Sequence, residues 1–237
     1  MILTDAHLHL ADGPLDGYGD FRSLGGYMAC TARMEEWAAV SEAVCPSRSY
    51  GIHPWYCGEW DAGVSDRLRT LLERDREAGV GEIGLDSKRG SVAEQLPVFE
   101  EQLSLASEMG RVASIHDVGC EKAVLDAVRA YDGFRGVILH SYSSDSYVKP
   151  FAEAGCHFSI GPRLLSRSDV RVSRLLRSIP LDRLLLESDA PHFPAWFCGM
   201  GDFVRRIAGY LGMEAEDLAE AVSGNYGRLV RGRGLLR

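Results

Sequence analysis

Imidazole and carboxylate side chains recur along this sequence where short apolar runs give way to turn residues. Residues i and i+2 of a strand face the same side, so His7 and His9 can address one point. Imidazole together with carboxylate is a ligand set that suits zinc and other divalent ions. The histidines in such positions are His7, His9, His53, His116 and His140, and the carboxylates are Glu82, Asp86, Glu187 and Asp189.

The number of these residues carries more weight than any single one. A lone histidine at the end of a strand is usually a packed or hydrogen-bonded residue. Five imidazoles and several carboxylates at the ends of six of the expected strands are not readily explained as independent structural features. A carboxylate that bridges two divalent ions holds them ~3.5–4 Å apart, which suits the activation of a water between them. The pattern therefore predicts a metal centre for hydrolysis.

Eight apolar runs are the elements that must position these side chains. Several of them, such as residues 136–140, are continuously apolar, as strands buried on both faces are. Between them, apolar residues recur at spacings of three and four, which is typical of helices. The expected strands are 2–7, 27–31, 48–53, 80–83, 112–116, 136–140, 156–160 and 183–187. The expected helices are 35–44, 64–78, 92–109, 120–131 and 168–179, with further helical patterns in 199–237.

Strand and helix alternate at intervals of about 30 residues, which is the pattern of a (β/α)₈ barrel. We therefore expect one α/β TIM-barrel domain over residues 1–237. Catalytic groups of such barrels lie at the carboxyl ends of the strands, where the polar residues above fall. An open doubly wound sheet is the alternative, but it needs a glycine fingerprint after an early strand, which this sequence lacks.

Composition excludes several classes of protein. The chain of 237 residues is 46% hydrophobic and 25% charged, so disorder and coiled coil are excluded. Its net charge of −8 argues against bulk electrostatic adhesion to nucleic acid or to acidic membranes. No apolar run approaches the ~20 residues of a membrane span. The six cysteines are scattered without a CxxC pair, which favours a reducing cytoplasm over a disulfide scaffold or a zinc finger.

Short motifs then connect the sequence to a known family. They are D-x-H-x-H at 5–9, G-[IL]-H-P at 51–54, G-E-[IT]-G-L-D at 81–86, the single histidines 116 and 140, E-[ST]-D-[AS]-P at 187–191 and N-x-x-R-L at 225–229. On these residues the chain resembles the TatD-type metal-dependent hydrolases of the amidohydrolase superfamily, over nearly its whole length. Members of that family include DNases, some of them 3′–5′ exonucleases, and some are linked to deacylation of misacylated tRNA.

The resemblance implies a centre of two divalent ions. One ion takes His7, His9 and Asp189, and Glu82 bridges it to the second. His116 and His140 hold that second ion. Magnesium, manganese or zinc occupies such sites, and imidazole donors are compatible with zinc or manganese.

The loops around the expected centre depart from the family. The family reads H-x-R after the fifth strand, where this chain has His116-Asp117-Val118, so an arginine for phosphate is missing. The family's H-C-F-[ST]-G becomes the segment 140–144, which lacks the turn glycine. Arg163 and Arg167 stand where many members have a lysine. We therefore expect hydrolysis of small phosphodiesters or of single-stranded nucleic acid, with weak activity on duplex DNA.

Each remaining candidate has a chemical role and an alternative. Asp189 accepts the proton of the attacking water, and Arg163 and Arg167 bind substrate phosphate. His53 orients substrate or the leaving group, or else steadies a metal ligand. The aromatic residues Trp55, Tyr56, Trp60, Phe193, Trp196 and Phe197 either stack nucleobases or cap the barrel.

The expected function is that of a phosphodiesterase or deoxyribonuclease with two divalent metal ions. The partners are the substrate alone, with no membrane, and the protein is expected to be a cytoplasmic monomer. Two other functions remain open from the sequence. One is an amide, ester or lactone hydrolase of the same superfamily, and the other is an inactive metal-binding barrel.

Overall fold

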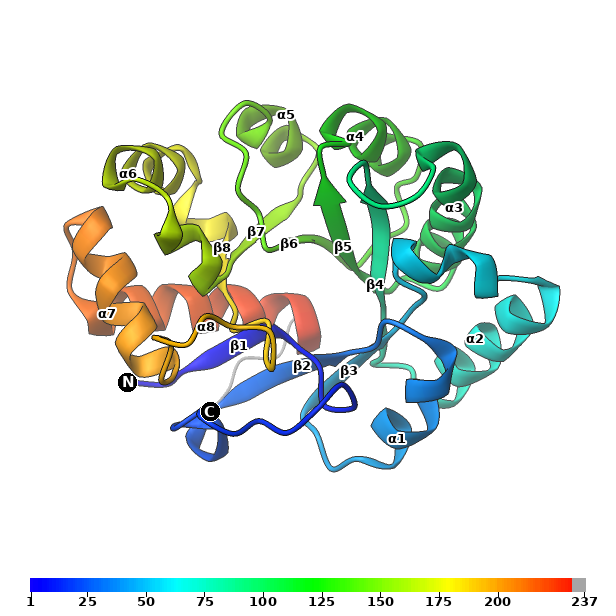
Figure 1. Ribbon diagram of the computed structural model, residues 1–237, viewed down its shortest axis with the longest axis horizontal. Coiled ribbons are helices and arrows are strands. Elements are labelled where there is room, and N and C mark those ends of the chain that lie inside the picture. The colour runs from blue at the N-terminus through cyan, green and yellow to red at the C-terminus, as the bar shows by residue number, and fades with distance from the viewer. Residues whose placement is uncertain (232–237) are drawn as a thin grey trace.

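Eight parallel strands form one sheet in the computed structural model, which describes residues 1–231 (Figure 1). Strands that follow one another in the chain are neighbours in the sheet, and every such pair is parallel. The strands are β1 (Thr4–Leu8), β2 (Gly26–Cys30), β3 (Ser47–Tyr50), β4 (Gly79–Asp86), β5 (Val112–Val118), β6 (Gly136–His140), β7 (His157–Ile160) and β8 (Leu184–Leu186). The predicted (β/α)₈ barrel is confirmed. The last six residues of the expected domain lie outside the described residues.

Helices surround the sheet on its outer side (Figure 1). They are α1 (Trp37–Glu42), α2 (Ala62–Arg74), α3 (Val92–Glu108), α4 (Glu121–Arg129), α5 (Val148–Glu153), α6 (Asp169–Ser178), α7 (Met200–Leu211) and α8 (Ala215–Arg231). Their inward positions are apolar at helical spacing. In α4, for example, Val124, Leu125 and Val128 are buried while the polar residues face solvent.

Backbone hydrogen bonds between β1 and the segment after β8 close the barrel near the carboxyl ends of its strands. The His9 amide donates to the Ala190 carbonyl at 2.7 Å, and the Asp189 amide donates to the His7 carbonyl at 3.1 Å. The fully buried Asp5 carboxylate accepts from the Ser188 amide at 2.9 Å. These contacts bring the first histidine pair beside Asp189, at the opposite end of the sequence.

A glycine lets β4 and β5 approach each other closely. Gly84 has a φ of 140°, and a Cβ built on it would lie 2.0 Å from the His116 carbonyl oxygen. Such contact excludes every larger residue, so the glycine between Glu82 and Asp86 is a packing requirement. It holds the strand of Glu82 against the strand of His116.

Most of the observed strand and helix bounds differ from the predicted ones by one to four residues, and three differences have a clear structural reason. β3 ends at Tyr50, so His53 lies after the strand and caps a 3₁₀ helix, η3 (Pro54–Glu59), with its ring. The strand predicted over 80–83 extends over Gly79–Asp86, because its pairing with β5 continues to Asp86. The short helix α5 was not among the predicted helices, since six residues with a proline inside provide little helical periodicity.

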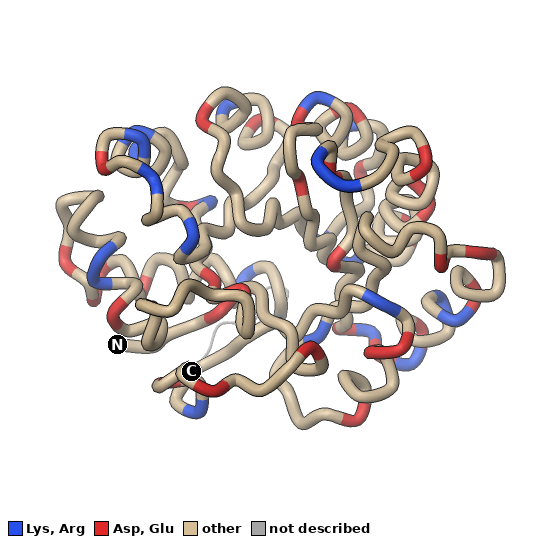
Figure 2. Tube along the Cα trace, viewed as in Figure 1, with Lys and Arg blue, Asp and Glu red and all other residues tan. Residues whose placement is uncertain are grey.

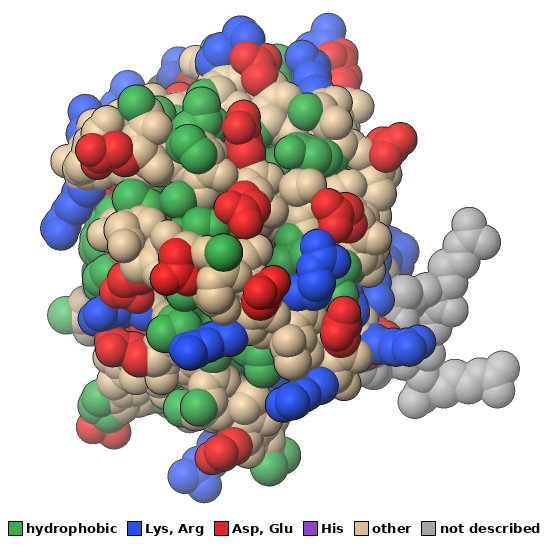
Figure 3. All heavy atoms as spheres, turned by 90° about the vertical axis from the view of Figure 1, so that its right-hand side faces the viewer, with side chains coloured by type: hydrophobic (Ala, Val, Ile, Leu, Met, Phe, Trp, Pro, Cys, Tyr) green, Lys and Arg blue, Asp and Glu red, His purple; other side chains and the backbone are tan. Residues whose placement is uncertain are grey.

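The outer surface carries charges of both signs. Acidic and basic residues alternate over the helices and loops (Figure 2). On the face shown in Figure 3, Lys and Arg lie among Asp and Glu, with small apolar areas between them. That face therefore presents no single-sign field to a polyanion. None of the helices in the described part of the chain is long and apolar enough to cross a membrane.

Candidate metal centre

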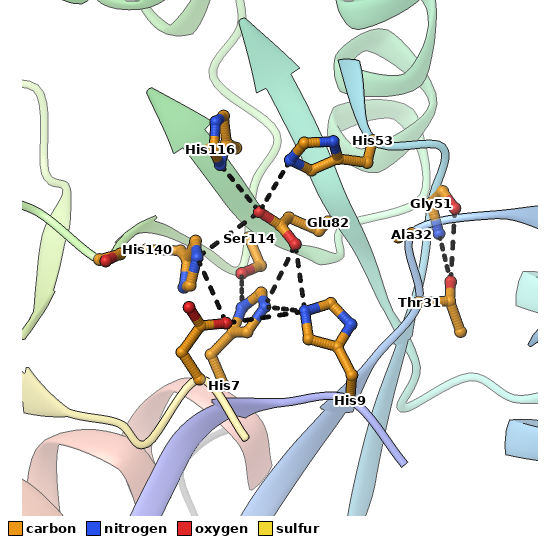
Figure 4. A network of polar contacts seen from close by, with 12 residues as sticks. His7, His9, Thr31, Ala32, Gly51, His53, Glu82, Ser114, His116 and His140 are labelled. Atoms are coloured by element: carbon orange, nitrogen blue, oxygen red, sulfur yellow. Dashed lines mark hydrogen bonds and ion pairs between the residues drawn. The ribbon is translucent and has the colours of Figure 1, made fainter. Parts of the chain in front are cut away.

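The Glu82 carboxylate lies among imidazoles at the carboxyl end of the barrel (Figure 4). On one side, its Oε2 is 3.4 Å from His7 Nε2 and 3.3 Å from His9 Nε2. The two Nε2 atoms are 3.2 Å apart. Ser114 Oγ lies 3.1 Å from Nδ1 of His7, which leaves Nε2 of that ring toward the carboxylate. Asp189 Oδ1 completes this group at 3.8 Å from His9 Nε2.

Three further imidazoles surround the other oxygen of the same carboxylate. Glu82 Oε1 is 3.0 Å from His116 Nδ1, 3.3 Å from His53 Nε2 and 3.5 Å from His140 Nε2. These rings come from β5, from the start of η3 and from the end of β6. His53 therefore lies as close to the carboxylate as the two rings that the resemblance assigns to a metal.

The spacing of these atoms fits a divalent ion. Bonds of about 2.1 Å in tetrahedral geometry place ligand atoms about 3.4 Å apart. The atoms of His7, His9 and Glu82 are separated by 3.2–3.4 Å, which matches that value. Three groups in the described residues keep their ligand atoms within 4.8 Å of one another: His7–His9–Glu82, His53–Glu82–His116 and His7–His140–Glu187.

The electrostatics favour an ionised carboxylate at the centre. Burial alone would raise the pKa of Glu82, but His53 and His140 outweigh it and hold the pKa well below its usual value. Burial alone would lower the pKa of His140, yet the carboxylates of Glu187 and Glu82 raise it to about 10. Burial keeps the pKa of His53 below its ordinary value. The Glu82 carboxylate is therefore held ionised among the imidazoles that surround it.

Two further carboxylates lie against rings of the centre and orient them. Glu187 Oε1 lies 2.8 Å from His140 Nδ1 and accepts from the Ser141 amide at 2.8 Å. Asp86 Oδ2 lies 3.4 Å from His116 Nε2. Carboxylates that hold the far nitrogen of an imidazole fix its orientation toward a metal. Glu187 and Asp86 stand at predicted strand ends, and the sequence predicted no role for either, although each belongs to a motif that also contains an expected ligand.

Asp189 occupies an unusual backbone conformation at the edge of the centre. Its φ of 57° is left-handed, a region that Asp enters more readily than most residues and that often marks a functional site. Its Oδ1 faces His9 at 3.8 Å and His140 at 4.0 Å. Its Oδ2 lies 4.0 Å from Arg163 Nε. One oxygen of this carboxylate thus points to the imidazoles and the other points to the cavity wall.

A cavity of about 740 Å³ opens above the centre. One wall carries the exposed guanidinium groups of Arg163, Arg167 and Arg171, from η4 (Pro162–Ser166) and the start of α6. Acidic residues also line the cavity, among them Asp117, whose pKa is raised to about 7 by burial. The two arginines that the sequence singled out therefore lie at the cavity, together with a third.

Hydrogen bonds already hold the first two arginines. Arg163 donates from Nε and Nη2 to the His192 carbonyl, at 3.0 and 2.6 Å. Arg167 Nη2 donates to Ser143 Oγ at 3.3 Å. Arg163 is thus fixed against the loop after β8, beside Asp189, and the sequence did not predict this contact because it is made by a backbone carbonyl 29 residues away.

The chain is similar to known proteins in sequence and in fold. The chain is 28% identical over 201 residues to the 3′-5′ ssDNA/RNA exonuclease TatD of Pantoea vagans, covering 76% of each chain. It superposes on the TatD homologue YJJV of Escherichia coli K12 with a TM-score of 0.82, at 22% identity over 96% of this chain and 97% of that one. A TatD family hydrolase of Entamoeba histolytica has a TM-score of 0.79 at 14% identity, over 98% of both chains.

A family model described as TatD related DNase matches residues 4–231, which include every strand of the barrel and all the residues around Glu82. This match covers far more than half of the chain. The chain therefore belongs to the TatD-related DNase family.

Proposed function

We propose that this protein is a metal-dependent hydrolase of phosphodiester bonds in small or single-stranded substrates. The observation that carries the proposal is the Glu82 carboxylate, with an imidazole nitrogen within 3.5 Å on both of its oxygens. A shared carboxylate of this kind suits a two-metal site for displacement at phosphorus. The names of the curated relatives, 3′-5′ ssDNA/RNA exonucleases, support the same class of reaction.

We assign the ligands as the resemblance implies. His7, His9 and Asp189 would hold one ion, His116 and His140 would hold the second, and Glu82 would be shared between the two. Two divalent ions, whether Zn²⁺, Mn²⁺ or Mg²⁺, would supply Lewis acidity and lower the pKa of a bound water toward neutrality.

The chain's own residues then handle the proton and the charge. Asp189 accepts the proton of the attacking water with the oxygen that faces the cavity. The guanidinium of Arg163 lies 4.0 Å from that same carboxylate and is therefore placed beside the reacting phosphate. Its positive charge stabilises negative charge on the phosphate. His53 orients the substrate or the leaving group from the opposite side of Glu82.

Replacement of Arg163 tests whether the arginines of the cavity wall bind the substrate phosphate. The Arg163→Ala variant is expected to lower kcat/KM for a phosphodiester by about ten- to a hundredfold, because a charge-assisted contact to phosphate is lost. Its melting temperature should change little, since the side chain is 61% exposed. The matched control is Arg174→Ala on α6, which removes an equally exposed arginine that pairs with Asp145. A large thermal loss with unchanged kinetics would make Arg163 a structural residue.

The substrate class is tested with a panel of single-stranded DNA, duplex DNA, bis-p-nitrophenyl phosphate and simple esters, each with several metals. We expect single strands and the small phosphodiester to be cleaved and duplex to be cleaved weakly. A cavity of about 740 Å³ has the size of a small-molecule pocket, and the arginine expected after His116 is replaced by Val118. Robust degradation of long duplex would contradict the expectation for duplex, and hydrolysis confined to esters would overturn the proposed reaction.

We propose further that the protein acts in the cytoplasm, as a monomer and as one domain over residues 1–237. The free state of all six cysteines supports a reducing compartment. Analytical ultracentrifugation of the purified protein tests the monomer.

A further inference from the structure

One large aromatic side chain is exposed at the rim of the cavity. Trp55, in η3, is 46% exposed and lines the cavity. Of the six aromatic residues that the sequence grouped after the third and eighth strands, only Trp55 does so. Phe197 is buried against Tyr18 and Phe193 and caps the barrel, whereas Trp196 is 37% exposed away from the cavity. The rim residue is therefore the one aromatic of that group open to a substrate.

The indole of Trp55 is held in place beside the metal centre. Its Nε1 donates to Asp86 Oδ2 at 2.7 Å, and that carboxylate is buried and also accepts from the Lys88 amide. The ring centroid lies 4.8 Å from that of His53 and 6.4 Å from that of His116. An exposed side chain normally samples several rotamers. The hydrogen bond to the buried Asp86 restricts this indole to one rotamer before any ligand binds, so binding loses less conformational entropy.

The two faces of the indole have different surroundings. The Arg89 guanidinium lies over the ring at 4.1 Å from the centroid, in a cation–π contact. Arg89 is not among the residues that line the cavity, whereas Trp55 is. The indole therefore has one contact, with Arg89, outside the cavity lining, while Trp55 itself is exposed and lines the cavity.

The same cavity also carries positive charge. Arg163, Arg167 and Arg171 line it with exposed guanidinium groups. His53, His116 and His140 of the imidazole cluster line it too. The cavity thus offers guanidinium groups for anionic groups and an exposed indole for a flat apolar group, and a nucleotide has both.

We infer that Trp55, backed by Arg89, is a stacking platform for an unpaired nucleobase next to the phosphate that is cleaved. This inference rests on the proposed function and adds the residue that selects single strands. Stacking on an indole requires a base with a free face, which a base inside a duplex lacks. The platform is tolerant of base identity, because every base presents a π-face.

The test compares oligonucleotides that differ only in one base. A nine-residue thymidine strand is cleaved in parallel with strands that carry an abasic tetrahydrofuran unit at the last or the next-to-last position. We expect loss of the base at one position to lower kcat/KM of the unaltered protein by about tenfold or more. In Trp55→Ala, the normal and abasic strands should be cleaved at equal rates. Trp55→Phe, which keeps an aromatic ring, should restore most of the difference.

The measured quantity is the ratio of kcat/KM for the normal strand to kcat/KM for the abasic strand, taken within each variant. Any effect of the Trp55 substitution on Asp86 and the metal centre changes both values and cancels in this ratio. The matched control is Trp196→Ala, which removes an exposed indole that also carries an arginine, Arg206, at 4.9 Å. It should keep the full base dependence. Equal cleavage of normal and abasic strands by the unaltered protein, or an undiminished ratio in Trp55→Ala, overturns the inference while leaving the proposed hydrolysis intact.

Binding gives a readout that does not depend on hydrolysis. Binding of dAMP and of deoxyribose 5-phosphate to the purified protein is measured by calorimetry. The unaltered protein should bind dAMP about tenfold more tightly, and Trp55→Ala should bind both equally. If no strand is cleaved but this preference is found, the proposed function fails and the platform stands. Equal affinities of the unaltered protein for dAMP and for deoxyribose 5-phosphate would contradict the inference that Trp55 stacks on a nucleobase.

Discussion

Replacement of Asp189 by asparagine is expected to lower kcat by about 10²–10⁴-fold, the usual value of a general base. The amide keeps the size of the side chain and one oxygen donor, but it cannot accept a proton. Metal content should fall only modestly, because one oxygen still faces the imidazoles of His9 and His140. The fold should persist, since the backbone contacts that close the barrel involve the Asp189 amide and not its side chain.

The competing interpretation is that Asp189 serves only to hold metal. In that case, excess metal should restore most of the rate of the asparagine variant, and such a rescue would overturn the role of base. The matched control is Asp12→Asn, which removes the same charge from an exposed residue that pairs with His192. Its kcat should stay within a few-fold of that of the unaltered protein.

Replacement of Glu82 by glutamine should have an effect at least as large, and for a different reason. This carboxylate is buried, and its two oxygens face five imidazoles. An amide has one acceptor oxygen and a nitrogen that only donates, so it cannot bridge two ions. We expect both bound metal and turnover to be lost, without rescue by moderate excess of metal.

Elemental analysis and single-turnover kinetics check this expectation. Glu121→Gln, which neutralises another acidic residue that lines the same cavity, is the control and should keep its metal. Full metal content in Glu82→Gln would show that Glu82 is not the bridge, and the assignment of two ions around it would then be wrong.

The barrel was predictable because its strands are buried on both faces. β6 was predicted with its observed bounds, since Gly136–His140 is apolar up to its terminal histidine. The helix predicted over 168–179 differs from α6 by one residue at each end, because its apolar residues recur at helical spacing. Where the pattern is short, as in α5, the sequence lacks the periodicity that would identify a helix.

The convergence of the site was predictable, but its outer contacts were not. Once the strands form a barrel, the residues at their carboxyl ends must meet, so the grouping around Glu82 follows from chain order alone. The contact of Asp86 with Trp55 joins two loops that are 31 residues apart. No local pattern encodes such a contact, and for the same reason the sequence left open which aromatic residues face the cavity.

The central claim is that this barrel holds two divalent ions around Glu82, and metal content tests it most directly. The purified protein is reconstituted with Zn²⁺, Mn²⁺ or Mg²⁺, and the metal bound per chain is measured by elemental analysis beside that of a His7→Ala/His9→Ala double variant. Two ions per chain in the unaltered protein, and at most one in the double variant, is the predicted result. Equal, near-zero metal in both proteins after reconstitution would contradict it.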